Sequence, residues 1–186
     1  MNHKLFKNLC SLLTPFILYR PVADWLALNL GCGPDYRVGY VNVDYRHDVK
    51  TDLDSDLCEF PWPWENDSVD DILMWHVLEH LPDTERTLRE IHRVLKLGGR
   101  FYGQVPFCRS ELSYAEPTHV KHFDWITFKA MERYGFRVVK SEPVAFNVTW
   151  RHTLRNLIPF RRSLSHLLWN MFDAVNFELV KKDEPI

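Results

Sequence analysis

The sequence predicts a single α/β domain, residues 1–186, in which helices flank a mostly parallel β-sheet with an antiparallel final strand. Short runs rich in β-branched residues alternate with amphipathic stretches, as in chains that build βαβ units. The chain has 186 residues, of which 46% are hydrophobic, so it can form one domain with a proper core. No internal repeat is visible.

The N-terminal segment, residues 1–22, is expected to form an amphipathic helix. Two lysines precede an apolar run at 9–18, which resembles a signal peptide, but no small-residue cleavage site follows it. The run is interrupted and too short to cross a bilayer. One helical stripe carries Leu5, Leu9, Leu12 and Phe16. This stripe favours a helix docked on the domain, with a membrane-surface anchor as the alternative.

Apolar runs predict the strands of the first half of the chain. The expected strands are 25–30, 40–44, a short strand ending near Asp52, and 69–75. A helix is expected at 83–97, because Pro82 suits a first turn and Asp83 favours the positive end of the helix. Gly98 and Gly99 are expected to stop it.

The second half continues the alternation. The expected elements are a strand at 100–105, a helix at 124–134, and strands at 136–140 and 177–181. Asp124 is the predicted N-cap of that helix and Gly135 its stop. Residues 145–172 are predicted to be a basic, aromatic insertion before the last strand, partly helical and broken at Pro159.

Charge and cysteine content exclude some functions. The formal net charge of −2 gives no general attraction to nucleic acid or to an acidic membrane. Cys10, Cys32, Cys58 and Cys108 are far apart, which argues against a structural zinc site and a disulfide framework and fits a reducing cytoplasm. No metal site is predicted. Ten carboxylates lie in 44–71, whereas 144–172 carries four arginines and no acid. The asymmetry indicates either two surfaces with different partners or two differently solvated faces.

The stretch "LNLGCGPDYRVGYVNVDYR" carries the main functional signal. A dinucleotide-binding loop has a third glycine and a following helix that holds the pyrophosphate, but Tyr36 stands at the third glycine position and only a turn fits before Val41. Gly31 and Gly33 still let a ligand lie against bare backbone, and Asp44 can accept from a ribose diol. A nucleoside without phosphates, such as S-adenosylmethionine (SAM), fits these features.

With "TDLDSDLCEFPWPWENDSVDDILMWHVLEHL", "LKLGGRFYGQVP" and "EPTHVKHFDWITF", the chain resembles the class I SAM-dependent methyltransferases. It is most similar to a small branch found with surface polysaccharide genes. The resemblance covers roughly 26–136 and implies a Rossmann-like fold and SAM as cofactor.

The resemblance also implies a set of cofactor contacts. Gly31, Cys32 and Gly33 would border the methionine part of SAM, Asp44 would hold the ribose, and Trp75 and His76 would border the methyl group. The adenine would lie near Tyr45, Asp52 and Leu53. The family often has an acid near the position of Asn29; the amide here can still accept a hydrogen bond. Alone, the glycines could form a plain turn, and Cys32 could be a small packing residue.

Methylation of a hydroxyl requires an aligned acceptor and the removal of a proton, for which histidine is well suited near neutral pH. His119 and His76 are the candidate bases. His80, His122 and Glu116 are candidates for acceptor binding. The alternative for any one of these histidines is a purely structural role.

No Asp/Asn-Pro-Pro-aromatic motif follows the fourth strand and no Pro-Cys nucleophile is present, which argues against DNA as the acceptor. With the resemblance stated above, the acceptor is expected to be a small or saccharide-like molecule, methylated at a hydroxyl.

The basic segment offers further predictions. Arg151, Arg155, Arg161 and Arg162 could hold an anionic part of the acceptor, and the aromatic residues around them could touch a membrane surface. A covering helix or a dimer contact is the alternative. Trp62 and Trp64 are interpreted as packing residues of a turn, with stacking on a sugar or on adenine as the other option. Two other functions stay open at this point, a non-catalytic SAM-binding or nucleoside-binding regulatory module and a peripheral membrane-binding protein.

Overall fold

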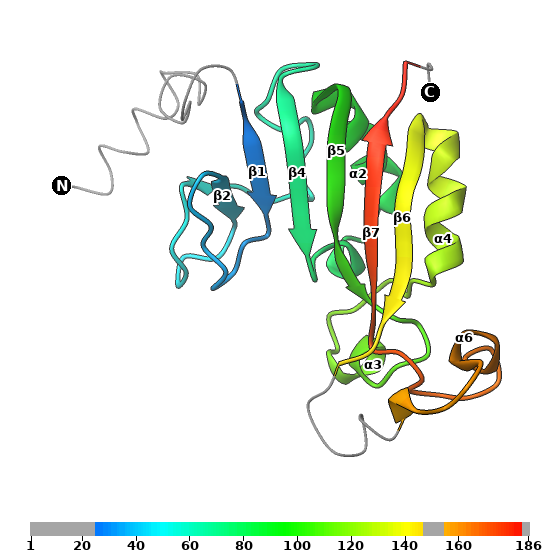
Figure 1. Ribbon diagram of the computed structural model, residues 1–186. Helices are drawn as coiled ribbons and strands as arrows, with labels where there is room; N and C mark the ends of the chain where they lie inside the picture. The colour runs from blue at the N-terminus through cyan, green and yellow to red at the C-terminus, as the bar shows by residue number, and fades with distance from the viewer. Residues whose placement is uncertain (1–24, 147–154, 184–186) are drawn as a thin grey trace.

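The computed structural model describes residues 25–146 and 155–183, which form a seven-stranded sheet in the order β3-β2-β1-β4-β5-β7-β6 (Figure 1). The strands are β1 Ala27–Leu30, β2 Val41–Asp44, β3 Leu53–Asp54, β4 Val69–Trp75, β5 Leu95–Pro106, β6 Phe136–Val144 and β7 Ala174–Lys181. The N-terminal helix predicted for residues 1–22 lies outside the described residues. Among the helices described, none is long and apolar enough to cross a membrane.

The strand directions confirm the predicted fold class. The pairs β1–β2, β2–β3, β1–β4 and β4–β5 are parallel. Strand β7 is antiparallel to both of its neighbours, β5 and β6. The last strand therefore does not extend the sheet at its edge but lies inside it, where it is hydrogen-bonded on both sides.

The helices are short and lie between the strands in sequence. They are η1 Leu78–His80, α2 Thr84–Val94, α3 Leu112–Ala115, α4 Trp125–Lys129, η2 Ala130–Tyr134 and α6 Arg161–Leu164. The helix predicted at 124–134 is present as α4 and η2, begins with a capping box at Asp124 and ends at Gly135, whose φ is 77°. Helix α3 was not predicted.

The predicted end of the helix at 83–97 is wrong. Helix α2 begins as expected, with the side chain of Asp83 accepting a hydrogen bond from the backbone N–H of Arg86, but it ends at Val94. Leu95 is fully buried and pairs with Val69 of β4, so sheet formation takes over before the glycines are reached.

The centre of the sheet is tightly packed between β4 and β5. A Cβ atom built on Gly103 of β5 would lie 1.7 Å from the carbonyl oxygen of Met74 on β4, so no larger residue fits there without moving the backbone. Trp62 and Trp64 are buried in the same core, and the Trp62 indole N–H donates to the carbonyl oxygen of Leu57. The packing interpretation of these two residues is thereby confirmed.

Candidate cofactor and acceptor site

The loops that follow β1 and β4 touch at the carboxyl edge of the sheet. Gly31, directly after β1, has a φ of 68°, and a Cβ atom there would lie 2.6 Å from a methyl group of Val77, after β4. From β1 the sheet continues through β2 on one side and through β4 on the other. In open α/β sheets ligands bind at this kind of switch point.

The glycine loop is held against β2 by its own backbone. The N–H groups of Gly31 and Cys32 both donate to the carbonyl oxygen of Val43, at 2.8 and 2.9 Å. The N–H of Gly33 donates to Oδ2 of Asp44 at 2.8 Å. A Cβ atom on Gly33 would have no other atom within 4 Å, so this side of the loop is open to a ligand.

Asp44 ends β2 as a buried carboxylate beside this open backbone. Its Oδ1 accepts from the backbone N–H of Arg46 at 2.9 Å, and its Oδ2 accepts from Gly33. A carboxylate offers about four lone-pair positions, so Asp44 can accept further bonds from a diol. The next side chain, Tyr45, is 65% exposed.

Asn29 and Asp52 belong to a hydrogen-bond network that fixes the loop between β1 and β2. Asn29 Nδ2 donates to the Asp35 carbonyl at 2.8 Å and to Asn42 Oδ1 at 2.9 Å. Asp52 accepts from the Tyr36 hydroxyl at 2.8 Å and from both the backbone and the side chain of Asn42. Sequence reasoning missed Asn42, although an amide between two buried valines of a parallel strand is an unusual feature.

Cys32 and Leu53, two further predicted cofactor residues, lie on the core side of the glycine loop and of β2. Cys32 is 4% exposed. Burial raises the pKa of its thiol to about 11, and the nearby carboxylates of Asp44 and Asp52 add to the shift. A thiol that stays protonated at neutral pH is a packing residue and not a nucleophile. Leu53 packs partly buried against the hydrophobic core.

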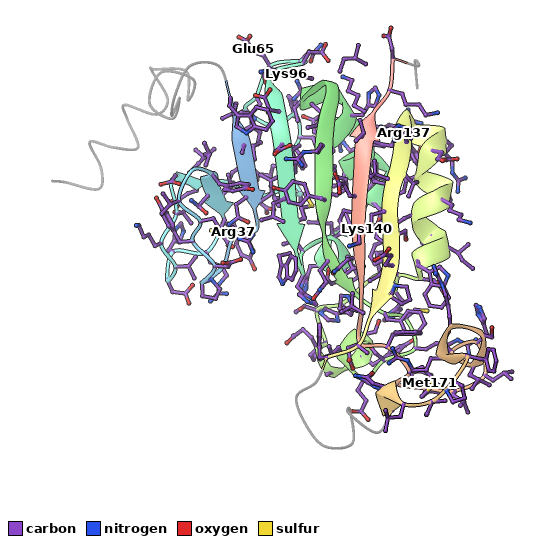
Figure 2. All side chains as sticks on the ribbon, in the orientation of Figure 1. Arg37, Glu65, Lys96, Arg137, Lys140 and Met171 are labelled. Carbon is purple, nitrogen blue, oxygen red and sulfur yellow. The ribbon has the colours of Figure 1, made fainter. Side chains whose placement is uncertain are left out.

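Trp75 and His76 follow β4 at the same edge. Trp75 is half-exposed, and the guanidinium carbon of Arg37 lies 5.8 Å from the centre of its ring. Figure 2 shows Arg37 on the loop that follows β1, so this loop reaches across toward the end of β4.

His76 has a φ of 56°, which is uncommon for a residue with a side chain and costs free energy. Its Nδ1 lies 3.2 Å from Glu79 Oε1, and its Nε2 lies 2.9 Å from Gln104 Oε1. Burial alone lowers the pKa of His76, but the hydrogen bond and charge of Glu79, together with Gln104, outweigh it and raise the pKa above its usual value. At a given pH, a smaller fraction of this ring is therefore in the neutral form that can act as a base than for a free histidine.

A second pair of histidines joins this cluster from η1 and the loop before α4. The rings of His80 and His119 are 4.7 Å apart between centroids. The carbonyl oxygen of Glu79 accepts from the N–H groups of Val120 and Lys121, at 2.9 and 3.1 Å, which anchors the later loop on η1. The structure thus brings together His76, His80 and His119, three of the predicted residues.

The other two predicted acceptor residues lie beside this cluster. Glu116 accepts a hydrogen bond from the Thr118 hydroxyl at 3.1 Å. His122 is exposed, lies 2.8 Å from Ser113 Oγ through its Nδ1, and stacks on Tyr114. Glu79 and Gln104 were missed by sequence reasoning; Glu79 stood in the quoted motif but was given no role.

The structure is at odds with a role for Arg155 in acceptor binding. Arg155 is buried, and its guanidinium donates to both carboxylate oxygens of Asp173, at 3.0 and 2.5 Å. The partner lies one residue beyond the stretch that carries no acid, so the charge count did not reveal it. Arg161 and Arg162 lie over the rings of Phe172 and Trp125, at 5.0 and 5.6 Å. Arg151 lies outside the described residues.

The insertion that carries these arginines lies at the carboxyl edge, next to α3. Figure 1 shows α3 and α6 below the sheet, toward the β6 and β7 side, while the loop after β1 lies at the opposite side, next to β2. Asn170 connects the two parts, because its Oδ1 accepts from the Glu111 N–H and its Nδ2 donates to the Glu111 side chain. Met171, labelled in Figure 2, leads from the insertion into β7.

Comparison with known proteins agrees with this geometry. Residues 28–103 match the family model described as a methyltransferase domain. No curated protein sequence matches the chain.

Three solved structures show the same fold. A SAM-dependent methyltransferase from Archaeoglobus fulgidus is 21% identical, with coverage of 95% of this chain and 94% of that one and a TM-score of 0.65. A SAM-dependent methyltransferase from Mesorhizobium loti is 17% identical, with coverage of 89% and 95% and a TM-score of 0.57. Phosphoethanolamine N-methyltransferase 2 from Haemonchus contortus, in complex with SAM, is 15% identical, with coverage of 95% and 52% and a TM-score of 0.57.

The matched segment contains the glycine loop, the carboxylate at the end of β2 and the residues that follow β4. Residues 28–103 thus match a methyltransferase domain, and the chain shares the fold of solved SAM-dependent methyltransferases.

Proposed function

We propose that this protein transfers the methyl group of SAM to an oxygen of a small or saccharide-like acceptor. One observation carries the proposal: a cluster of three histidines and the buried Glu79 lies at the same sheet edge as the glycine loop and Asp44. Methyl transfer releases a neutral thioether, so the leaving group needs little help. The protein has to align the acceptor and, for a hydroxyl, remove its proton.

SAM would lie across the ends of β1, β2 and β4. The open backbone at Gly33 suits the amino acid part, and Asp44 would accept from the ribose hydroxyls. Asp52 already accepts three hydrogen bonds from Tyr36 and Asn42. Its carboxylate is therefore already engaged in the loop network, and the exposed ring of Tyr45 is the larger surface for the base.

Of the two candidate bases, His119 is better suited than His76. Both ring nitrogens of His76 are engaged, by Glu79 and by Gln104. His119 uses only Nδ1, which lies 3.2 Å from the carbonyl oxygen of Ser113, so its Nε2 can carry a lone pair. A base oriented through its second nitrogen is the arrangement that proton abstraction needs.

The test is a methyl-transfer assay that follows formation of S-adenosylhomocysteine with a panel of hydroxylated acceptors, nucleotide sugars included. His119→Ala should lower kcat by roughly 10²- to 10⁴-fold with unchanged affinity for S-adenosylhomocysteine. His166→Ala is the matched control, because His166 is exposed, contacts the ring of Trp125 and lies outside the cluster. Methylation of amines only, or no transfer to any acceptor, would contradict the proposal.

The segment around α6 favours a second, additional role in contact with a membrane surface or a lipid-linked acceptor. Arg161 and Arg162 lie among large exposed apolar side chains, namely Leu157, Phe160, Leu167, Leu168 and Trp169. Basic and apolar groups together are typical of segments that bind at a lipid interface.

Co-sedimentation with vesicles of anionic lipid tests this role. Binding should fall when Phe160 and Leu167 are both replaced by Ser, and it should weaken with added salt. Equal binding by the wild-type protein and the double variant would exclude the role.

A further inference from the structure

Glu79, His80 and His119 form a cluster with the geometry of a metal site. One potential ligand atom from each side chain lies within 4.8 Å of the other two. Glu79 and His80 are consecutive in η1, whereas His119 comes from the loop before α4. That loop is fixed at this place because the backbone N–H groups of Val120 and Lys121 donate to the Glu79 carbonyl oxygen.

The carboxylate of Glu79 is incompletely satisfied. Glu79 is 1% exposed, and its Oε2 has no hydrogen-bond partner among the described residues. Its other oxygen is 3.2 Å from Nδ1 of His76. A buried carboxylate oxygen without a partner is costly, because water has been removed and nothing replaces it. A cation at Oε2 would remove this cost.

The two imidazoles are oriented as metal-binding histidines usually are. His80 Nδ1 lies 3.3 Å from the Thr118 carbonyl oxygen and 3.0 Å from its hydroxyl. His119 Nδ1 lies 3.2 Å from the Ser113 carbonyl oxygen. A ring that donates Nδ1–H to a carbonyl carries its lone pair on Nε2, and histidine ligands of metals are commonly fixed in this way.

We propose that Glu79, His80 and His119 bind a divalent transition-metal ion such as Zn²⁺. Two imidazoles and one carboxylate suit Zn²⁺ and its neighbours in the first transition row, whereas Mg²⁺ prefers oxygen ligands. Bonds of about 2.1 Å place tetrahedral ligand atoms about 3.4 Å apart. Since the three ligand atoms lie within 4.8 Å of one another, no pair has to approach by more than about 1.4 Å, which a shift of the loop around His119 would supply.

The ion would lie next to His76, on the acceptor side of the site. Three protein ligands leave a coordination position for water or for an acceptor oxygen, whose pKa a divalent ion lowers. This catalytic consequence, though not the binding itself, rests on the proposed function. In that case His119 acts as a ligand and not as the base, because one lone pair cannot serve both roles.

The test is a titration of the full chain with Co²⁺ and Zn²⁺ after removal of metals with a chelator, in the absence of SAM and acceptor. We expect one Co²⁺ per chain with visible d–d absorption, displaced by one Zn²⁺. His119→Ala and Glu79→Gln should each weaken Zn²⁺ binding by about 100-fold or more, since loss of even a residue that only hydrogen-bonds to a ligand costs about 10–100-fold.

His47→Ala is the matched control. His47 is exposed and its Nδ1 lies 3.8 Å from Asp54 Oδ2. Removing this surface pair shows how much an ordinary His–Asp pair outside the cluster contributes to zinc binding. This variant should bind Zn²⁺ like the wild-type protein. Binding that is lost in His47→Ala and retained in His119→Ala would overturn the proposal.

Thermal unfolding shows whether a variant has lost only the metal site or the whole fold. Zn²⁺ should raise the Tm of the wild-type protein by mass action and leave the Tm of His119→Ala unchanged. His119 lies in a loop and is only partly buried, so this variant can decide even if Glu79→Gln fails to fold. No stoichiometric binding by the wild-type protein would overturn the proposal, whether or not the protein transfers methyl groups.

Discussion

Gly31 and Gly33 have similar backbone conformations, but the atoms around them differ. Both have positive φ values, 68° and 49°. A Cβ atom on Gly31 would collide with Val77, whereas one on Gly33 would meet nothing within 4 Å. The first glycine therefore allows the loops after β1 and β4 to pack together, and the second leaves room beside the backbone for a ligand.

This difference predicts separate effects of the two alanine substitutions. Gly33→Ala should lower the free energy of unfolding by about 1–2 kcal/mol, the cost of a left-handed residue, and should weaken S-adenosylhomocysteine binding by about tenfold or more. Gly31→Ala should lose more stability, because strain and collision add. Urea unfolding and calorimetry measure the two effects. If Gly33→Ala binds the cofactor product as tightly as the wild-type protein, SAM does not lie against this loop.

Asp44 is the predicted ribose ligand. Asp44→Ala removes charge-assisted hydrogen bonds worth about 1.5–3 kcal/mol, so the Kd of S-adenosylhomocysteine should rise by roughly ten- to a hundredfold. Asp48→Ala is the control, since Asp48 is an exposed carboxylate of the same loop, paired with Arg46. An unchanged Kd in Asp44→Ala would remove Asp44 from the site.

At the scale of elements, the insertion before β7 is held to the sheet by a buried ion pair. Arg155 and Asp173 are both buried, and Asp173 also accepts from the backbone N–H of Phe146, at the opposite end of the insertion. Both ends of the segment are thus tied to one carboxylate.

Arg155→Ala should destabilise the protein by about 3–5 kcal/mol, because it leaves a buried carboxylate without its partner. Arg162→Gln, at an exposed arginine seven residues further on, should leave the free energy of unfolding within about 0.5 kcal/mol of the wild-type value. Chemical denaturation compares the two variants. Equal stability of both would mean that the insertion is not anchored by this pair.

The elements that sequence could predict are those with local signals. Short runs rich in apolar residues marked β1, β2 and β4, and Asp124 and Gly135 marked the two ends of α4 and η2. The end of α2 could not be predicted in this way. The glycines at 98 and 99 are a local stop signal, but the helix already ends before them because Leu95 pairs with β4.

In the candidate site, residues with a recognisable role in a motif were found, and residues whose role depends on a partner elsewhere in the chain were not. Gly31, Gly33 and Asp44 lie within one short stretch. The carbonyl oxygen of Glu79 accepts from the N–H groups of Val120 and Lys121, and Gln104 Oε1 lies 2.9 Å from His76 Nε2. Both contacts join segments far apart in sequence. Such contacts have no local pattern, so only the folded chain reveals them.

At the scale of the whole molecule, the sheet order determines which cofactor fits. From β1 the sheet continues through β2 on one side and through β4 on the other, and the chain leaves β1 at this switch point through the short glycine loop. A pyrophosphate needs the N-terminus of a helix there, and the chain goes from the loop into β2 without one.

S-adenosylhomocysteine should therefore raise the Tm of the protein, whereas NAD at equal concentration should leave it unchanged. A ligand at about 100 times its Kd adds about 2.7 kcal/mol to the free energy of unfolding. Differential scanning fluorimetry with both ligands provides the measurement, and calorimetry the affinities. A larger shift with NAD would refute the assignment of the loop.

The position of β7 also governs how the molecule can be made. Residues 174–181 are synthesised after β6, yet they lie between β5 and β6 and pair with both. Until this stretch has been synthesised, β5 and β6 each have an edge without its neighbouring strand. Unpaired strand edges are sites at which other chains can add, so the nascent protein is most exposed to aggregation before residues 174–181 can join the sheet.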